Sequence, residues 1–362
     1  MHVLAGLAGV ALIIAMLAEF FVAFMLPRRV RRDPQIARGI YTALWRPWRM
    51  AAALLSPAAE DTMLGFFGPL ALLLQLVIWV LGIMIGFALL HWAYGSELGA
   101  GVHHFGDDLY FSSGEFLSAA VTSAPIGAAA KALSLAEAAT GVFVIFIVIG
   151  YLPSVYFAFS RREVAVSQLA SRAGTPPTAV HLLRRISEHD RWDQLRDYLG
   201  EAEGWVAEMM ETHLSYPLLA YYRSQHVNQN WLAALTVIVD TSAAIIAALP
   251  EGDPAIAEQT YAIGRHALSD LAHQFRVRPV EANRLTEKAF DDIWDAVESH
   301  PLRGLTSDRE TMRRRLDHLR ETYEPNAIGL SIALGLPLPA WAPAERPQRA
   351  PRPPRLRAGA TA

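Results

Sequence analysis

Three long blocks of apolar residues constrain this chain more than any other feature of its sequence. They run from His2 to Leu26, from Leu64 to Tyr94 and from Ala132 to Phe159. The first block carries one carboxylate, Glu19, the second carries no Asp, Glu, Lys or Arg, and the third carries only Glu137. An α-helix of roughly 20 apolar residues crosses the hydrocarbon layer of a bilayer. The blocks therefore predict an all-α membrane protein with three transmembrane helices.

The charged residues of the connecting segments predict the orientation. Segment 27–63 holds seven arginines, whereas segment 95–131 holds one lysine and four acids. Cytoplasmic loops carry the excess of positive charge, so the first segment is expected inside the cell and the second outside. The N-terminus is then outside and everything after Arg161 is cytoplasmic, in a multi-pass protein of the cell inner membrane. Because the basic residues follow the first block, we expect an uncleaved anchor helix rather than a signal peptide.

The stretch between the second and third blocks, residues 107–126, reads DDLYFSSGEFLSAAVTSAPI. Asp107 and Asp108 favour the start of a short helix by capping and by complementing the helix dipole, and Pro125 suits its end. Such a segment can re-enter the membrane, where its backbone lines a cavity or is buried in protein. It can also lie on the outer surface as an amphipathic helix. Composition leaves both arrangements open.

Several motifs spread over residues 64–340 carry a resemblance to a known family. They are Leu109-Tyr110-Phe111-Ser112, Leu135-Ala136-Glu137-Ala138, Ile149-Gly150-Tyr151-Leu152-Pro153, Phe159-Ser160-Arg161-Arg162-Glu163-Val164, Gly174-Thr175-Pro176-Pro177, His213-Leu214-Ser215-Tyr216-Pro217 and Asn230-Trp231-Leu232-Ala233-Ala234-Leu235. In these motifs the chain resembles bacterial potassium channel proteins with a two-transmembrane, ion-channel-2 type pore domain. The resemblance implies a pore domain at 64–160 with a re-entrant pore helix, and a homotetramer whose pore loops converge on the axis. It also implies passive conduction of a monovalent cation, K⁺ or Na⁺, with no cofactor.

The selectivity filter is where the chain departs from that family. The family's Thr-x-Gly-Tyr/Phe-Gly-Asp pattern falls on Ser118, Ala119, Ala120, Val121, Thr122 and Ser123. Both filter glycines are thus replaced, by Ala120 and Thr122. A potassium filter turns successive carbonyls to one side, with backbone angles that cost a residue other than glycine roughly 1–2 kcal/mol. Two such positions in four subunits amount to roughly 8–16 kcal/mol, so the usual filter is not expected to form.

Two arrangements of this segment remain open from the sequence. The hydroxyls of Ser118, Thr122 and Ser123 can line a wider pore, which predicts a cation channel with altered or weak selectivity. Alternatively, the apolar side chains of Ala119–Val121 and Ala124 can close the pore, because hydrophobic constrictions gate by dewetting. The second arrangement predicts a non-conducting relative that keeps the channel fold for assembly or sensing.

The acidic residues of the outer segment are candidates for the pore mouth. Asp107, Asp108 and Glu115, repeated around a ring of four subunits, would concentrate cations there. A normally solvated acidic loop explains the same residues equally well.

Gly141, Gly150 and Pro153 are candidates for a gating hinge, since they interrupt the third span where a bend would be useful. Close packing of helices explains the two glycines more simply. Glu137 lies near the outer end of the same span, where an acid in this class of fold can brace the pore helix from behind.

The rest of the chain predicts two cytoplasmic parts besides the anchor helix and arginine-rich loop at 1–63. Apolar residues recur at helical spacing over 161–335, which indicates a cytoplasmic helical domain. Its helices are expected at about 204–225, 229–249, 254–274, 281–299 and 306–323. The apolar run of the second is interrupted by Asp240, so we expect a buried core helix and not a fourth span. Segment 336–362, with seven prolines and five arginines, is predicted to be disordered.

Several function classes are excluded or disfavoured. The chain has no cysteine, so thiol catalysis and zinc–thiolate sites are excluded, and its net charge of −3 argues against nucleic-acid binding. Phosphate-loop, dinucleotide, zinc-protease and serine-hydrolase motifs are missing, and the histidines of the cytoplasmic half show no metal-binding spacing. We therefore expect no enzyme and no bound metal. The expected partners are the lipid bilayer, further copies of the chain and a cytoplasmic partner of the helical domain.

Overall fold

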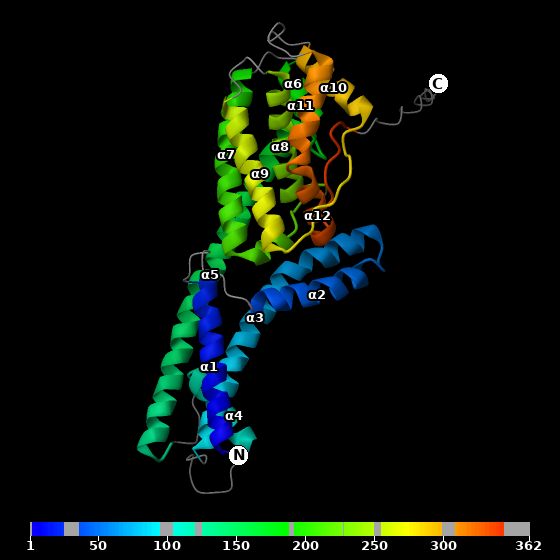
Figure 1. Ribbon diagram of the computed structural model, residues 1–362. Helices are drawn as coiled ribbons and strands as arrows, with labels where there is room; N and C mark the ends of the chain where they lie inside the picture. The colour runs from blue at the N-terminus through cyan, green and yellow to red at the C-terminus, as the bar shows by residue number, and fades with distance from the viewer. Residues whose placement is uncertain are drawn as a thin grey trace, which may run out of the picture. The chain divides into compact units, whose positions relative to one another are not determined.

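A computed structural model describes residues 2–24, 36–94, 104–119, 125–187, 192–226, 228–249, 255–298 and 308–343 (Figure 1). Within these ranges all regular elements are helices, as the sequence predicts. The chain divides into two compact units. Unit 1 holds residues 1–165, 204–227 and 273–276, and unit 2 holds residues 166–203, 228–272 and 277–362. Parts of the predicted cytoplasmic domain therefore belong to unit 1.

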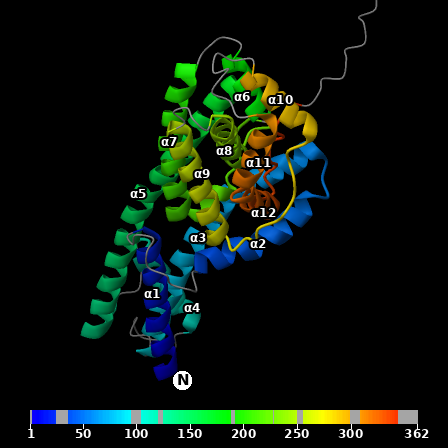
Figure 2. The same ribbon diagram turned by 45° about the horizontal axis from the view of Figure 1, so that its top comes forward.

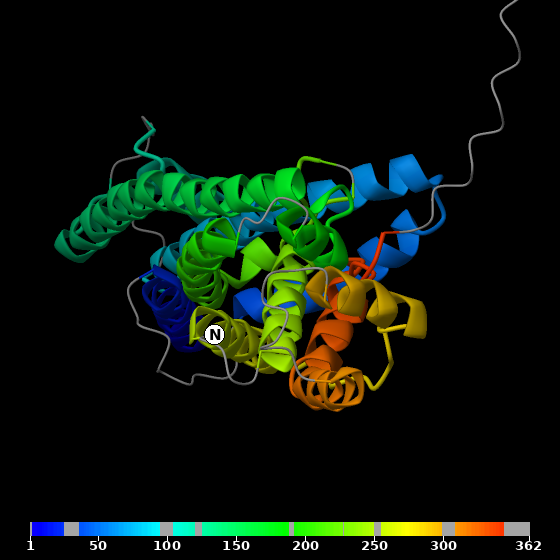
Figure 3. The same cartoon turned by 90° about the horizontal axis from the view of Figure 1, so that it is seen from above.

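Unit 1 is built on long apolar helices. Its elements are α1 (His2–Phe24), α2 (Ile36–Ala52), α3 (Pro57–Ala93), α4 (Phe105–Phe116), most of α5 (Ala128–Ala173), the second half of α7 (Trp192–Ser215) and the 3₁₀-helix η1 (Pro217–Tyr221). With 37 and 46 residues, α3 and α5 are longer than a crossing of the roughly 30 Å hydrocarbon layer requires. Figure 3 shows α5 as one uninterrupted helix.

Small residues bring α1 and α3 into close contact. A Cβ added to Gly86 would lie 2.6 Å from Cγ1 of Ile13, and one added to Gly9 would lie 2.6 Å from the Gly86 carbonyl oxygen. Nearby, the rings of Phe20 and Trp79 lie 4.5 Å apart. Glycine contacts of this kind let helices approach closely within a membrane, where the lipid supplies no hydrophobic drive for helices to associate.

Four helices are long and apolar enough to cross a membrane, namely α1, α3, α5 and α8 (Trp231–Ala248). The apolar windows of α1 and α5 are only 22 % and 17 % buried, whereas that of α8 is 94 % buried. Large exposed apolar surfaces on a helix are typical of contact with a partner or a membrane. A helix that is apolar all round and enclosed by protein belongs to a core. The structure thus confirms α8 as a buried core helix.

Unit 2 is arranged around α8, as Figure 2 shows. Its other helices are α6 (Ala179–Ser187), α9 (Ala255–Gln274), α10 (Glu287–Glu298), α11 (Arg309–Glu321) and α12 (Glu324–Leu334). The side chain of Asn230 caps α8 by accepting a 2.7 Å hydrogen bond from the Ala233 N–H. The buried hydroxyls of Thr236, Thr241 and Ser242 each donate to the carbonyl four residues earlier. Polar atoms of α8 are thereby satisfied inside the core.

Some predicted helix boundaries after residue 161 are wrong. The helix expected at 204–225 begins at Trp192 and ends at Ser215, because Pro217 starts η1 instead of continuing the α-helix. The helix expected from residue 281 begins at Glu287. Residues 336–343 of the predicted disordered tail pack into unit 2, where Trp341 is fully buried and its carbonyl accepts a 3.0 Å hydrogen bond from Val180. Residues 344–362 lie outside the described ranges.

Candidate functional site

The short helix expected near Asp107 is α4, which begins two residues earlier, at Phe105. The Asp107 carboxylate accepts a 2.8 Å hydrogen bond from the His104 N–H, just ahead of the helix. With Asp108, it also places negative charge in the first turn, where the helix dipole favours it. The predicted start of a short helix at Asp107 and Asp108 is therefore confirmed to within two residues.

The predicted end of α4 near Pro125 is wrong, because the helix stops at Phe116. Ser118 has a left-handed φ of 52°. The N–H groups of Ser118 and Ala119 bond to the carbonyls of Glu115 and Gly114, at 3.1 and 2.8 Å. These are the two hydrogen bonds of a Schellman motif, in which glycine usually takes the left-handed position. Helix α4 thus closes directly before the predicted filter segment.

Only the first part of that segment is described. Ser118 and Ala119 are both exposed. Ala120, Val121, Thr122 and Ser123 lie outside the described residues.

A buried polar group connects α4 to the two long helices on either side of it. The Glu137 carboxylate of α5 receives a hydrogen bond from the Ser112 hydroxyl of α4, and its other oxygen lies 3.3 Å from Nε2 of His91 in α3. The Ser112 hydroxyl also lies 2.8 Å from the carbonyl oxygen of Met84 in α3. All three polar side chains are buried. We call this group of His91, Ser112 and Glu137 the brace.

Gly141 forms the second contact between α4 and α5. A Cβ added to Gly141 would lie 2.0 Å from the carbonyl oxygen of Phe116, at the last turn of α4. Such a separation is impossible, so any other residue would displace α4. A Cβ at Gly150 would meet nothing within 4 Å, and α5 continues as one helix through Pro153. The geometry gives Gly141 a packing role, and it leaves the hinge at Gly150 and Pro153 a prediction.

The three acids proposed for the pore mouth have different environments. Asp107 is exposed, whereas Asp108 is fully buried. Glu115 is partly buried and accepts a 2.8 Å hydrogen bond from the Ser134 hydroxyl of α5. Of the three, Asp107 alone presents its carboxylate openly to solvent within a single chain.

A second buried polar group, the Arg162 junction, lies at the other end of α5 within unit 1. The guanidinium of Arg162 donates to the carbonyl oxygens of Leu219 and Tyr222 at 2.8 and 2.9 Å, and to the carboxylate of Glu163. Its Nη1 lies 3.4 Å from Nε2 of His213. Planar arginine suits such a site because its donors diverge in a fixed fork. One side chain thus fastens α5 to η1.

The other faces of η1 pack on aromatic side chains of α2 and α3. The ring of Tyr221 lies 5.2 Å from that of Trp45 and 5.3 Å from that of Phe67. A Cβ at Gly68 would lie 2.6 Å from the ring of Tyr222, so this glycine makes room for the tyrosine. Three helices of unit 1 therefore meet at η1.

The tautomer of His213 follows from its neighbours. Its Nδ1 lies 2.8 Å from the Met209 carbonyl oxygen, which can only accept, so Nδ1 carries the proton. Nε2 is then free of hydrogen and faces the donor Arg162. Burial, together with the positive charge of Arg162, lowers the pKa of His213 to about 3.

This low pKa predicts a loss of stability in mild acid. The unfolded chain binds a proton at His213 below about pH 6.5, whereas the folded chain does so only near pH 3. The full unfolding free energy is therefore present above pH 6.5. As the pH falls below that value, the unprotonated His213 of the folded chain lowers it by about 1.4 kcal/mol per pH unit. Between pH 6.5 and 5 the unfolding free energy should drop by about 2 kcal/mol from this group. Thermal midpoints in detergent at several pH values measure the drop, and His213→Gln should remove that part of it. Identical pH profiles for the two proteins would contradict the prediction.

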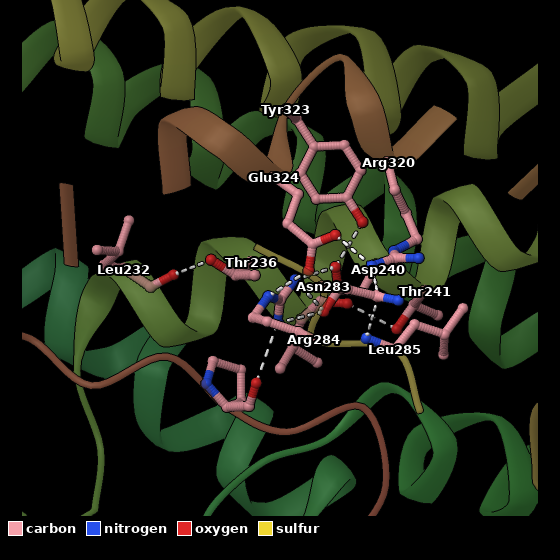
Figure 4. Close-up of polar contacts among 12 residues, drawn as sticks. Leu232, Thr236, Asp240, Thr241, Asn283, Arg284, Leu285, Arg320, Tyr323 and Glu324 are labelled. Atoms are coloured by element: carbon pink, nitrogen blue, oxygen red, sulfur yellow. Dashed lines mark hydrogen bonds and ion pairs between the residues drawn. The ribbon is translucent and has the colours of Figure 1, made fainter. Parts of the chain in front are cut away.

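Unit 2 contains a buried group of charges, shown in Figure 4. Asp240 of α8 faces Arg284, with Oδ1–Nη2 and Oδ2–Nη1 distances of 2.9 and 3.2 Å. Nε of Arg284 lies 2.7 Å from Oε1 of Glu324, and the other oxygen of Glu324 accepts from Arg320. The Tyr323 hydroxyl donates to Asp240. We call these five residues the α8 charge network.

The α8 charge network is electrically balanced, with two carboxylates and two guanidiniums. Burial alone would lower the pKa of Arg284, but the negative charge of Asp240 and Glu324 outweighs it, so that pKa is raised and Arg284 stays charged. The ring of Trp341 lies beneath Arg284 and Arg320, and its centre is 5.8 Å from the guanidinium carbon of each. The Pro339 carbonyl accepts a 3.0 Å hydrogen bond from Arg284. These contacts explain why residues 336–343 are packed despite their composition.

Glu137 and Asp240 stand out in the sequence, but their partners do not. His91, Ser112, Arg284 and Glu324 come from other elements, and no local spacing joins them. A signal was present for His91, which with Gln75 is one of the few polar residues of the second apolar block. Among the described residues, no three His, Cys, Asp or Glu side chains are grouped closely enough to hold a metal ion.

Comparison with known proteins gives no assignment. The chain matches no protein-family model, no curated protein and no solved structure.

Proposed function

We propose that four copies of this chain form a cation channel of the potassium-channel pore class, with weak or altered selectivity. In this proposal α1, α3 and α5 cross the cell inner membrane, with the N-terminus outside and the C-terminus in the cytoplasm. Helix α4 enters from the outer side as the pore helix. The proposal is independent of any catalytic group or cofactor.

The observation that carries the proposal is the way α4 is held. It has 12 residues, too few to cross a bilayer, and it lies between two helices that are long enough to do so. Ionisable groups within a membrane are costly and mark functional positions. Here Glu137 and His91 form the buried contacts that hold α4 in place. Gly141 allows the last turn of α4 to contact α5. A short helix fixed this firmly is an anchor for the segment that follows it.

The direction of α4 supports a preference for cations. Its carbonyl end, which carries the negative end of the helix dipole, leads straight into Ser118 and the predicted filter. Negative potential at that point favours a cation over an anion. In a tetramer, four such ends would point to the segments at 118–123.

Purified protein reconstituted in liposomes tests the proposal by K⁺ and Na⁺ flux. Gly141→Ala is expected to reduce the flux at least tenfold, because its Cβ would overlap the Phe116 carbonyl. Gly65→Ala is the matched control, since a Cβ there would meet nothing within 4 Å. Size-exclusion profiles show whether each variant still assembles. Absence of flux in the unmodified protein under voltage, pH and osmotic challenge would contradict conduction.

A non-conducting protein with the channel fold is the second candidate, and the replaced filter glycines favour it. It predicts that Ala120→Gly combined with Thr122→Gly creates no flux. A channel predicts that the same double substitution changes the ratio of K⁺ to Na⁺ flux. In either case, unit 2 would serve assembly, gating or the binding of a cytoplasmic partner.

A further inference from the structure

The hairpin of α2 and the start of α3 has two contrasting faces. On the inner face, Trp45 is buried against Phe67, with ring centres 4.8 Å apart. The indole N–H of Trp48 donates a 2.9 Å hydrogen bond to the carbonyl of Met63. Helix α2 is therefore firmly folded back on α3.

The outer face and the turn of this hairpin expose large apolar side chains. Met50 is 72 % exposed, Leu54 is 87 % exposed and Leu55 is 45 % exposed. Arg46 is exposed one turn before Met50. We call these four residues the hairpin tip. Single exposed apolar residues are common, but three within six positions beside an arginine form an amphipathic surface patch.

We propose that the hairpin tip binds the surface of a bilayer that contains anionic phospholipid. The inference rests on the proposed membrane placement of α1, α3 and α5. An amphipathic surface that combines apolar side chains with arginine lies at the boundary of headgroups and acyl chains. Arginines of this kind are attracted to anionic headgroups.

The course of α3 places the tip where it can reach such a surface. Pro69 lies inside α3, and a proline removes a backbone hydrogen bond and bends a helix. Figure 1 shows the N-terminal part of α3, with α2 beside it, running sideways from α1 and from the rest of α3. The same helix then continues into a candidate membrane span. The hairpin is thus continuous with this candidate span and turns sideways from it.

The acids at the start of α3 do not cancel the positive charge of the tip. Glu60 and Asp61 both interact electrostatically with Arg223, which is largely buried in unit 1. Arg46 and Arg49 add two positive charges within the described part of α2. The charge of the hairpin region therefore complements an anionic surface.

A single-cysteine label tests the proposal cleanly, because the chain has no cysteine of its own. Leu54→Cys carries an environment-sensitive fluorophore, and the full chain is reconstituted in phosphatidylcholine vesicles with or without phosphatidylglycerol and with spin-labelled quencher lipid. Ile14→Cys, on the exposed apolar face of α1, is the positive control. Asp193→Cys, in α7, is the control for exposure to water.

The expected result is quenching at position 54 in phosphatidylglycerol vesicles, close to that at position 14. Adding Arg46→Glu should lower the ratio of lipid-contacting to water-exposed label about fivefold with the anionic lipid. A label at 54 that behaves like the one at 193 would overturn the proposal. So would a shielded label without lipid quenching, which would show that protein covers the tip. If position 14 is not quenched either, the membrane placement itself has failed.

Discussion

Asp240→Asn is expected to destabilise the protein by about 3–5 kcal/mol, because it leaves a buried positive charge uncompensated. Two carboxylates balance two guanidiniums in the α8 charge network, and the substitution removes one of the four charges. Each kcal/mol lowers the thermal midpoint of a domain of this size by about 2–4 °C. The fall should therefore be about 6–20 °C. Thermal unfolding in detergent, followed by tryptophan fluorescence, reports it through the buried Trp231 and Trp341.

Two further variants make this prediction specific. Asp291→Asn removes an equivalent charge that pairs with Arg309 at the surface, where both side chains are 53 % exposed. Exposed ion pairs contribute about 0–1 kcal/mol, so this control should change the midpoint little. Asp240→Asn combined with Arg284→Met restores charge balance, and it should recover much of the stability lost in the single variant. Equal effects of Asp240→Asn and Asp291→Asn would contradict the importance of the network.

Arg162→Met is the second substitution with a large expected effect. It removes the hydrogen bonds to the Leu219 and Tyr222 carbonyls and to Glu163, and leaves these acceptors buried or partly buried. Loss of a buried charged partner costs about 3–5 kcal/mol. We expect a fall in the thermal midpoint of unit 1 and a change in the emission of Trp45, which packs on η1.

The neighbouring residue provides a matched control. Arg161 is 73 % exposed and pairs with the exposed Glu208, so Arg161→Met should shift the midpoint by no more than a few degrees. Arg162→Lys keeps the charge but lacks the planar fork. We therefore expect it to lie between Arg162→Met and the unmodified protein. If Arg161→Met and Arg162→Met behave alike, Arg162 does not fasten α5 to η1.

The channel proposal and the Arg162 junction concern opposite ends of the same helix. Gly141 of α5 holds the end of α4, and Arg162 of α5 holds η1. A displacement of η1 would act on α5, which is one continuous helix of 46 residues. Comparing cation flux through Arg162→Lys with flux through the unmodified protein tests whether the contact of Arg162 with η1 affects the pore.

The sequence alone determined the features that depend on neighbouring residues. The apolar runs give α1, α3 and α5 as candidate spans because helix length and hydropathy are local properties. Asp107 and Asp108 locate the start of α4 for the same reason. Asp240 likewise predicted a core helix at α8, since an acid inside an apolar run needs a partner, and α8 is enclosed by protein.

Only the tertiary structure decided which residues meet. The brace joins residues that are 25 and 46 positions apart, and the network joins Asp240 to Tyr323 across 83 positions. The order of residues 336–343 likewise depends on Trp341 lying beneath two arginines, so their proline-rich composition gave the wrong answer. Hydrogen bonds and packing between distant segments depend on a geometry that exists only once the helices have assembled. No periodicity in the chain encodes them.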